Sequence, residues 1–162
     1  MFTSSQLRLA ERVLAEARDQ GVRIVTAESC TGGLIGGLLT EIPGSSDVID
    51  RGFIVYSNRA KKDLLGVPGD IIADMGAVSE PVARLMAEGA LSNSNAHLAV
   101  AVTGIAGPSG GTPLKPIGLV HIAVARENRS IRHEAHRFGD IGRGQVRIKT
   151  MEAALQLLLT ML

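Results

Sequence analysis

Hydrophobic positions along the chain follow two patterns, one with steps of three and four residues and one with continuous apolar runs. The first pattern predicts a helix that begins with a cap at Ser4 or Ser5 and ends at Gly21. The second predicts buried strands, because short apolar runs rich in β-branched residues and bounded by polar turns are typical of strands inside a sheet. The predicted strands are residues 22–27, 52–57 and 97–104.

Helical segments separate these strands and follow the last one. A capping Ser79 predicts a long helix through Leu91, and further helices are predicted at 34–42, 58–66 and 144–162. Residues 117–125 and 130–138 flank a polar turn and predict an antiparallel hairpin. This order of elements predicts a single α/β domain over residues 1–162, with three α/β/α layers and a mixed sheet.

The composition is that of a globular protein. Hydrophobic residues make up 45% of the chain and charged residues 20%, a balance that excludes a disordered protein. The net charge is +1, but residues 126–149 hold seven basic side chains against three acidic ones. This excess can attract a phosphate, yet it lacks the interleaved aromatic residues of a nucleic-acid footprint, so we expect no nucleic-acid partner. A solvated hairpin face is the alternative interpretation for most of these arginines.

The cysteine content bears on disulfides and metal sites, and the length of the apolar runs bears on membrane insertion and secretion. Cys30 is the single cysteine, and no Cys and His residues have zinc-binding spacing, so we expect neither a disulfide nor a metal site. No apolar run reaches the roughly 18 residues of a membrane span, and the first residues lack the apolar run of a signal peptide. We therefore expect a soluble, cytoplasmic protein without a membrane partner.

Three polar loops interrupt the apolar framework, each at the carboxyl end of a predicted strand. They are ESCTGG at 28–33, YSNRAK at 56–61 and TGIAGPSGG at 103–111. Loops at the carboxyl ends of neighbouring strands meet at one edge of an open α/β sheet, which is where such sheets bind ligands. We therefore expect a single site to which all three loops contribute.

The ESCTGG loop leads from a strand into a glycine-rich helix start, where a nucleophile can be exposed. Ser29 or Cys30 is the candidate, and backbone N–H groups around Gly32 and Gly33 could stabilise an oxyanion. The alternative is that Ser29 caps the helix and Cys30 is a small core residue. All four histidines fall in predicted strands, which argues against a Ser-His-Asp triad and for core or surface roles: His97, His121, His133 and His136.

Lys61 is the remaining candidate for the base that a serine nucleophile needs. Its spacing from Tyr56 carries the chain from a strand end into a first helical turn, so both side chains can face one pocket, where Tyr56 could relay or orient the base. Burial and cationic neighbours would lower the pKa of Lys61, and we expect Glu28 to brace the turn through backbone N–H groups instead of pairing with the lysine. The alternative for Lys61, as for Lys62, is a solvated surface charge.

The glycine-rich segment from residue 104 to 118 has five glycines and three prolines in 15 positions, which predicts a loop. It lacks the Gly-Lys-Ser/Thr ending of a Walker A motif and does not match the dinucleotide fingerprint, which disfavours nucleoside-triphosphate hydrolysis. Its backbone donors, together with Thr103 and Ser109, suit a ribose or a single phosphate.

Five motifs, in order and spacing, resemble the CinA carboxy-terminal domain family: TAESCTGG, GSSDVIDRGFIVYSNRAK, GAVSEPVA, VTGIAGPSGGTPLKPIG and GDIGRGQVR. The resemblance runs from Ala10 to Leu158. Stand-alone members of that family are nicotinamide mononucleotide deamidases, which release ammonia and nicotinic acid mononucleotide in pyridine-nucleotide salvage. The resemblance therefore implies a serine-lysine amidohydrolase that acts on a small mononucleotide, needs no cofactor and forms a homodimer. The alternative is a non-catalytic nucleotide-binding module of the same fold.

By motif match, the resemblance implies that Ser29 is the nucleophile and Lys61 the base, with Tyr56 beside them. It implies oxyanion or substrate-binding roles for a larger set: Cys30, Thr31, Gly32, Gly33, Ser46, Thr103, Gly104 and Gly107. It implies that the substrate phosphate binds to Arg143 or Arg147, which lie four residues apart and can share a helix face. GDIGRGQVR is one residue longer than the frequent form of this motif, so the motif match does not decide which of the two arginines binds the phosphate. Leu119 also departs from the family, in which a Thr is common at that position.

Overall fold

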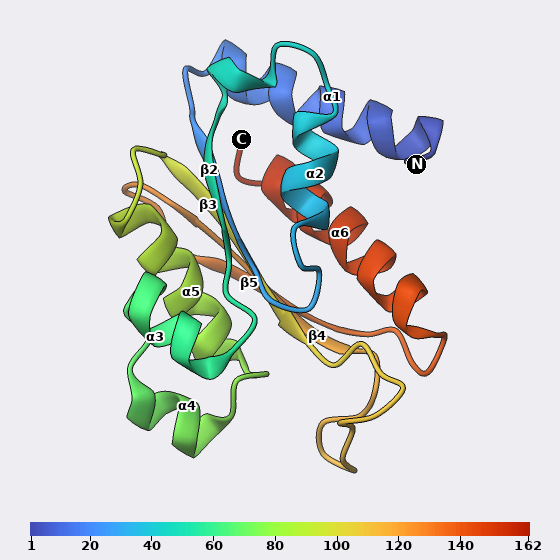
Figure 1. Ribbon diagram of the computed structural model, residues 1–162. Helices are drawn as coiled ribbons and strands as arrows, with labels where there is room; N and C mark the ends of the chain where they lie inside the picture. Colours follow the sequence, from blue (N-terminus) through green and yellow to red (C-terminus); the bar gives the residue numbers. More distant parts are fainter.

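A five-stranded mixed sheet forms the middle layer of the computed structural model, which describes residues 1–162 (Figure 1). The strand order is β2-β1-β3-β4-β5; β2, β1 and β3 run parallel, and β4 and β5 are added antiparallel. This arrangement confirms the predicted mixed α/β sheet with its hairpin at the end. The strands are β1 Ile24–Glu28, β2 Ile49–Ile54, β3 Leu98–Gly104, β4 Leu119–Arg126 and β5 Arg132–Arg137.

Helices cover both faces of the sheet and complete the three layers (Figure 1). One face packs against α1 Ser4–Asp19, α2 Leu34–Thr40 and α6 Arg143–Leu159. The other face packs against α3 Asn58–Leu65, α4 Gly69–Met75 and α5 Glu80–Ser92. A short 3-10 helix, Ser45–Asp47, leads into β2.

The two faces of the sheet differ in side-chain size. In β3, Val100 and Val102 point into the larger core beneath α1, α2 and α6, whereas Ala99 and Ala101 face α5. The same alternation continues in β4 with Ala123 on the α5 side. Small side chains let a helix approach a sheet closely, which suits a core that is poor in aromatic residues.

The start of the second strand and the cap of the first helix differ from the sequence prediction. The second strand is Ile49–Ile54 instead of 52–57, because Ile49 pairs with Ile24 and the chain leaves the sheet after Ile54 to form the cap of α3 at Ser57. The cap of α1 is Thr3, which forms a capping box with Gln6, instead of Ser4 or Ser5.

Two other features were not foreseen from the sequence. Helix α4 was not predicted; Pro68 serves as its N-cap. His97 lies one residue before β3 instead of inside it, and its Nδ1 accepts a hydrogen bond from the Arg23 amide at 2.9 Å.

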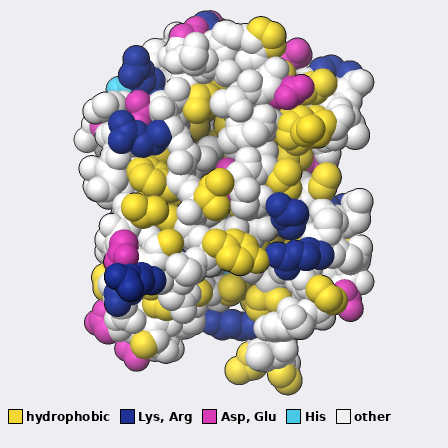
Figure 2. Space-filling model, viewed as in Figure 1, with side chains coloured by type: hydrophobic (Ala, Val, Ile, Leu, Met, Phe, Trp, Pro, Cys, Tyr) yellow, Lys and Arg dark blue, Asp and Glu magenta, His cyan; other side chains and the backbone are white.

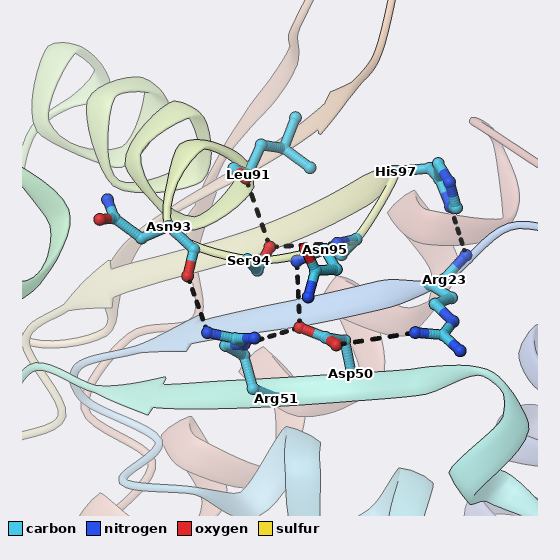
Figure 3. A network of polar contacts seen from close by, with 9 residues as sticks. Arg23, Asp50, Arg51, Leu91, Asn93, Ser94, Asn95 and His97 are labelled. Atoms are coloured by element: carbon cyan, nitrogen blue, oxygen red, sulfur yellow. Dashed lines mark hydrogen bonds and ion pairs between the residues drawn. The ribbon is translucent and has the colours of Figure 1, made fainter.

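A polar network ties together the amino ends of the three parallel strands (Figure 3). Asp50 accepts hydrogen bonds from Arg51 Nε at 2.6 Å and from the Asn95 amide at 3.3 Å, and it pairs with Arg23 at 4.0 Å. Arg51 also donates to the Asn93 carbonyl at 3.1 Å. Burial acts to raise the pKa of Asp50, but hydrogen bonds from Arg51 and Asn95 outweigh it and leave the pKa below its usual value. This edge is therefore held by polar contacts, while the opposite edge is left for the three loops.

We predict that Gly89→Ala destabilises the fold by roughly 1 to 3 kcal/mol. A Cβ at Gly89 in α5 would lie 2.0 Å from the Leu65 carbonyl oxygen, so α3 and α5 would have to separate. The matched control is Gly144→Ala in α6, where nothing lies within 4 Å and the change should be neutral or stabilising. Urea unfolding measures both variants, and equal stability of the two would contradict the close approach of these helices.

Candidate active site

The first predicted loop forms a tight turn between β1 and α2. Gly32 and Gly33 adopt positive φ values of 58° and 101°, which side chains rarely tolerate and which glycine permits. The Ser29 amide donates to the Val102 carbonyl at 3.1 Å, and the Gly32 amide donates to the Ser29 carbonyl at 3.1 Å. The turn is therefore fixed to β3 and presents Ser29 at the carboxyl edge of the sheet.

Glu28 braces this turn from inside, as expected from the sequence. Its carboxylate accepts hydrogen bonds from the Thr31 hydroxyl at 2.6 Å and from the amides of Ile35 and Gly36 at 2.9 and 3.0 Å. These amides belong to the first turn of α2, where the partial positive charge of the helix favours an anion. Glu28 is fully occupied by these donors and makes no ion pair with Lys61.

Lys61 reaches the turn from α3 and is 1% exposed. Its Nζ donates to Ser29 Oγ at 3.0 Å, to the Val55 carbonyl at 2.9 Å and to the Tyr56 carbonyl at 3.4 Å. A neutral amine could keep both carbonyl contacts through its two N–H bonds and turn its lone pair to the serine hydroxyl. The surface-charge alternative for Lys61 is therefore wrong.

Burial lowers the pKa of Lys61 from its usual value, since the charged form loses hydration inside the protein. Cationic neighbours do not contribute to this lowering of the pKa as predicted, and Cys30 acts in the opposite direction. The lowered pKa increases the fraction of neutral amine next to Ser29.

Cys30 differs from Ser29 in its surroundings. It is 5% exposed and belongs to the hydrophobic core beneath α2 and α6. Burial raises the pKa of its thiol to about 12, so the nucleophilic thiolate is scarce at neutral pH. Of the two candidates, only Ser29 forms a hydrogen bond with Lys61, and Cys30 fits the alternative of a small core residue.

The two arginines of the last motif lie in different places. Arg143, the first residue of α6, donates to the Tyr56 hydroxyl and to the Gly107 carbonyl, both at 2.8 Å. Arg147 donates to the carbonyls of Cys30 and Thr31 at 3.1 and 3.0 Å. Arg147 therefore holds the ESCTGG turn, whereas Arg143 bridges the other two loops.

Tyr56 contacts Lys61 through its backbone and not through its ring. The Tyr56 carbonyl accepts from Lys61, while the hydroxyl bonds to Arg143 and the side chain is 61% exposed. No hydrogen bond links the hydroxyl to Lys61, so the side chain is placed to orient Arg143 at the pocket rim.

A pocket of about 240 Å³ joins these groups. Ser29 and Lys61 line it together with Cys30, Tyr56, Thr103, Gly104 and Arg143. Thr103 is held by a hydrogen bond of 2.9 Å to the Ala77 carbonyl, and Ala77 and Val78 also line the pocket. These two residues were not singled out from the sequence, although they lie in the GAVSEPVA motif, because small apolar side chains carry no chemical signal of their own.

The remaining predicted site residues lie around this pocket or away from it. Thr31, Gly32 and Gly33 shape the turn, and Gly107 contributes its carbonyl to Arg143. Ser46 is not brought into the pocket; it lines a separate hollow of about 540 Å³ along β2, together with Thr40 and Arg51.

Charged and hydrophobic side chains share the molecular surface. On the face drawn in Figure 2, Lys and Arg side chains lie beside hydrophobic ones across the middle, and most Asp and Glu side chains lie nearer the rim. No group of three or more His, Cys, Asp or Glu side chains gathers with the arrangement of a metal site. No helix has the length together with the apolar character needed to cross a membrane.

Comparison with known proteins gives consistent matches along the whole chain. The profile of the CinA C-terminal domain family matches residues 6–162. A CinA-like protein of Chlorobium phaeobacteroides is 48% identical over 160 residues, which is 97% of this chain and 38% of that protein. The chain spans about a third of the length of the curated relatives it matches.

Solved structures are similar over their whole length. The competence/damage inducible protein CihA from Agrobacterium tumefaciens has a TM-score of 0.97 and 50% identity, covering 99% of this chain and 97% of that one. A CinA superfamily protein from Escherichia coli has a TM-score of 0.92 and 28% identity, covering 100% of this chain and 94% of that one.

The lowered pKa of Lys61 predicts a specific pH dependence of stability. The folded state holds the Lys61 proton less tightly than the unfolded chain does. Between the lowered pKa and about 10.4, the unfolded state therefore binds more protons. The free energy of unfolding rises with pH in that window. Below the lowered pKa both states are protonated and the full burial penalty remains. Lys61→Met removes this contribution, so its stability relative to the original chain should decrease as pH rises through the window.

Urea unfolding of both proteins at a series of pH values measures this difference, in which the contributions of other groups cancel. Lys62→Met, at an exposed neighbouring position, is the matched control and should show a flat difference. A flat difference for Lys61→Met as well would mean that burial does not lower the pKa of this lysine.

Proposed function

The chain belongs to the CinA C-terminal domain family, and we propose that it is an amidohydrolase that converts nicotinamide mononucleotide to nicotinic acid mononucleotide and ammonia. One observation carries the proposal: Ser29 Oγ lies 3.0 Å from Nζ of the buried Lys61, inside a pocket at the carboxyl edge of the sheet. A hydroxyl and a desolvated amine at this distance are the two groups that serine-lysine amide hydrolysis needs.

In the first half of the proposed reaction, Ser29 Oγ attacks the carboxamide carbon and the neutral Lys61 amine takes the hydroxyl proton. The tetrahedral intermediate then collapses. Its carbon–nitrogen bond breaks, Lys61 returns the proton to the departing nitrogen, and ammonia leaves. The product of this half is an ester between Ser29 and the nicotinate carboxyl group.

In the second half, water replaces ammonia as the reacting group. Lys61 takes a proton from the water as it adds to the ester, and the ester bond to Ser29 breaks with return of that proton to Oγ. Nicotinic acid mononucleotide is released, and Ser29 and Lys61 return to their starting protonation states. The same two side chains therefore serve both halves, and the chain supplies no further acid or base within 3.5 Å of Lys61 Nζ.

Backbone N–H groups of the turn are suited to hold the negative charge on the carbonyl oxygen. The amides of Ser29 and Gly32 are already bonded to carbonyls, whereas those of Cys30, Thr31 and Gly33 donate to no carbonyl of the chain. The amide after a nucleophile on such a turn is a common oxyanion donor. We assign this role first to the Cys30 amide, which needs the backbone and not the thiol of that residue.

Arg143 is the arginine that we assign to the substrate phosphate. It lines the same pocket as Ser29, and its partners there are a neutral hydroxyl and a carbonyl, so its charge is not neutralised by a carboxylate. Arg147 points its guanidinium at two turn carbonyls instead. A phosphate at Arg143 would gain a charge-assisted, bidentate contact.

We predict that Ser29→Ala abolishes ammonia release from nicotinamide mononucleotide while the protein keeps its fold, because the nucleophile is removed from a turn held by backbone contacts. Cys30→Ala should retain most of the activity, since that thiol is buried and protonated. Ammonia release and thermal unfolding of both variants are the measurements. Loss of activity in Cys30→Ala with retention in Ser29→Ala would reverse the assignment, and no release by the original chain would favour a non-catalytic nucleotide-binding module.

We predict that Arg143→Gln weakens binding of the mononucleotide by roughly 1.5 to 3 kcal/mol, the value of a charge-assisted contact, and raises KM accordingly. Nicotinamide riboside, which lacks the phosphate, should be a poor substrate for the original chain. Its kcat/KM should fall little further in Arg143→Gln. Arg147→Gln should instead lower kcat, because it loosens the turn that carries Ser29. Steady-state kinetics on both substrates separate these effects, and equal efficiency on riboside and mononucleotide would show that Arg143 reads no phosphate.

A further inference from the structure

A second cluster of ionisable side chains lies on the α5 side of the β4–β5 hairpin, outside the Ser29 pocket. His121 Nδ1 and His133 Nε2 are 2.9 Å apart, and their rings are stacked with centroids at 5.1 Å. His133 Nδ1 lies 3.5 Å from Glu80 Oε1, and Glu80 is itself paired with Arg84 at 2.8 Å. The four side chains therefore form one connected row that starts at the first turn of α5 and ends at His121.

The carboxylate at one end of the row sets the proton positions along it. The Glu80 carboxylate can only accept, so a proton on His133 Nδ1 is the arrangement that suits this 3.5 Å contact, and it leaves the Nε2 of His133 as an acceptor. His121 must then donate from Nδ1, which leaves its Nε2 unprotonated. Burial, followed by the neighbouring His133, lowers the pKa of His121 to about 4, so the ring is neutral at neutral pH.

The free nitrogen of this row opens into a cavity. His121 Nε2 has no partner in the chain, and no buried polar side-chain atom of the protein is left unpaired, so this nitrogen is accessible. His121 lines a cavity of about 610 Å³. The cavity is separate from the Ser29 pocket, with which it shares only Val78.

The walls of the cavity combine apolar surface with positive charge. Met75 and Leu114, which are 47% and 86% exposed, contribute apolar surface to its lining. Arg84, Lys115 and Arg137 line it against the single carboxylate of Glu80, a net charge of +2 with neutral histidine. Arg137 has no hydrogen bond or ion pair from its side chain, so its guanidinium is available to a ligand.

We propose that this cavity, the histidine cavity, binds a phosphate monoester that carries a ring and a hydroxyl group. The phosphate dianion matches the net charge of the walls and contacts Arg137 and Lys115. The hydroxyl donates to His121 Nε2, and the ring covers the apolar walls formed by Met75 and Leu114. This binding does not depend on the proposed amide hydrolysis, because none of its contacts involves Ser29, Lys61 or Arg143.

Adenosine 5′-monophosphate is a suitable probe, since it has all three features. Calorimetric titration into the full chain should show one-site binding that adenosine, which lacks the phosphate, does not reproduce. Arg137→Gln should weaken binding by about tenfold or more through loss of a charge-assisted contact. The matched control is Arg132→Gln. Arg132 is an exposed residue of the same strand that does not line the cavity, so this variant should bind the probe with the affinity of the original chain.

Nitrogen chemical shifts of the histidine rings test the acceptor directly. His121 Nε2 should be unprotonated in the free protein and should shift when the probe is added, whereas the ring of His136, outside the cavity, should not. His121→Phe keeps a ring of similar shape without the acceptor and should weaken binding, and thermal unfolding checks that it remains folded. A protonated Nε2 in the free protein would contradict the proton positions assigned to the row and overturn the proposed acceptor.

Arg143→Gln distinguishes this cavity from the Ser29 pocket. The proposal is supported if the probe still binds to Arg143→Gln but no longer binds to Arg137→Gln. Binding that is lost in Arg143→Gln and kept in Arg137→Gln places the probe in the Ser29 pocket and overturns it. The absence of saturable binding at roughly 10 mM probe, weaker than any specific site of this size should be, overturns it as well. None of these outcomes depends on ammonia release.

Discussion

The contact between Lys61 and Ser29 imposes conditions on much of the structure around it. A lysine that is 1% exposed needs acceptors for its donors, and the carbonyls of Val55 and Tyr56 provide them because β2 ends at Ile54 and the chain turns away there. The carboxylate of Glu28, at the start of the Ser29 turn, would hold the lysine in its charged form if it pointed at the amine. It is kept away by three donors of the α2 turn.

The packing of α3 and α5 delivers this lysine to the sheet. Gly89 lets the two helices meet at the Leu65 carbonyl, and alanines on the α5 side of β3 and β4 let α5 lie close to the strands. With α5 in this position, the segment before it brings Ala77 and Val78 to the pocket and fixes Thr103 through the Ala77 carbonyl. Small residues that have no chemistry of their own thus determine where the reactive groups lie.

The sequence predicted features that depend on local pattern and left open those that depend on distant contacts. The mixed sheet and the turn at Ser29 follow from periodicity and glycine positions. The bracing role of Glu28 follows from the need for a lowered pKa at Lys61, which a carboxylate paired with the amine would raise. The bounds of β2 could not be derived, because its register is set by pairing with Ile24. Arg143 and Arg147 share a helix, and only the fold shows that one meets Tyr56 and the other the turn carbonyls. The histidines were expected to have core or surface roles, since nothing local signals that His121 and His133 are paired across two strands.

Burial of Lys61 has two opposite effects that come from one physical cause. Loss of hydration disfavours the ammonium form, which lowers the stability of the folded chain and also supplies neutral amine. A lysine with its ordinary pKa would be neutral only about once in two thousand molecules at pH 7. The surrounding structure must therefore be rigid enough to keep the side chain from turning out to water. The Ser57 cap of α3, the turn glycines and the Arg147 contacts provide that rigidity without placing a carboxylate beside the amine.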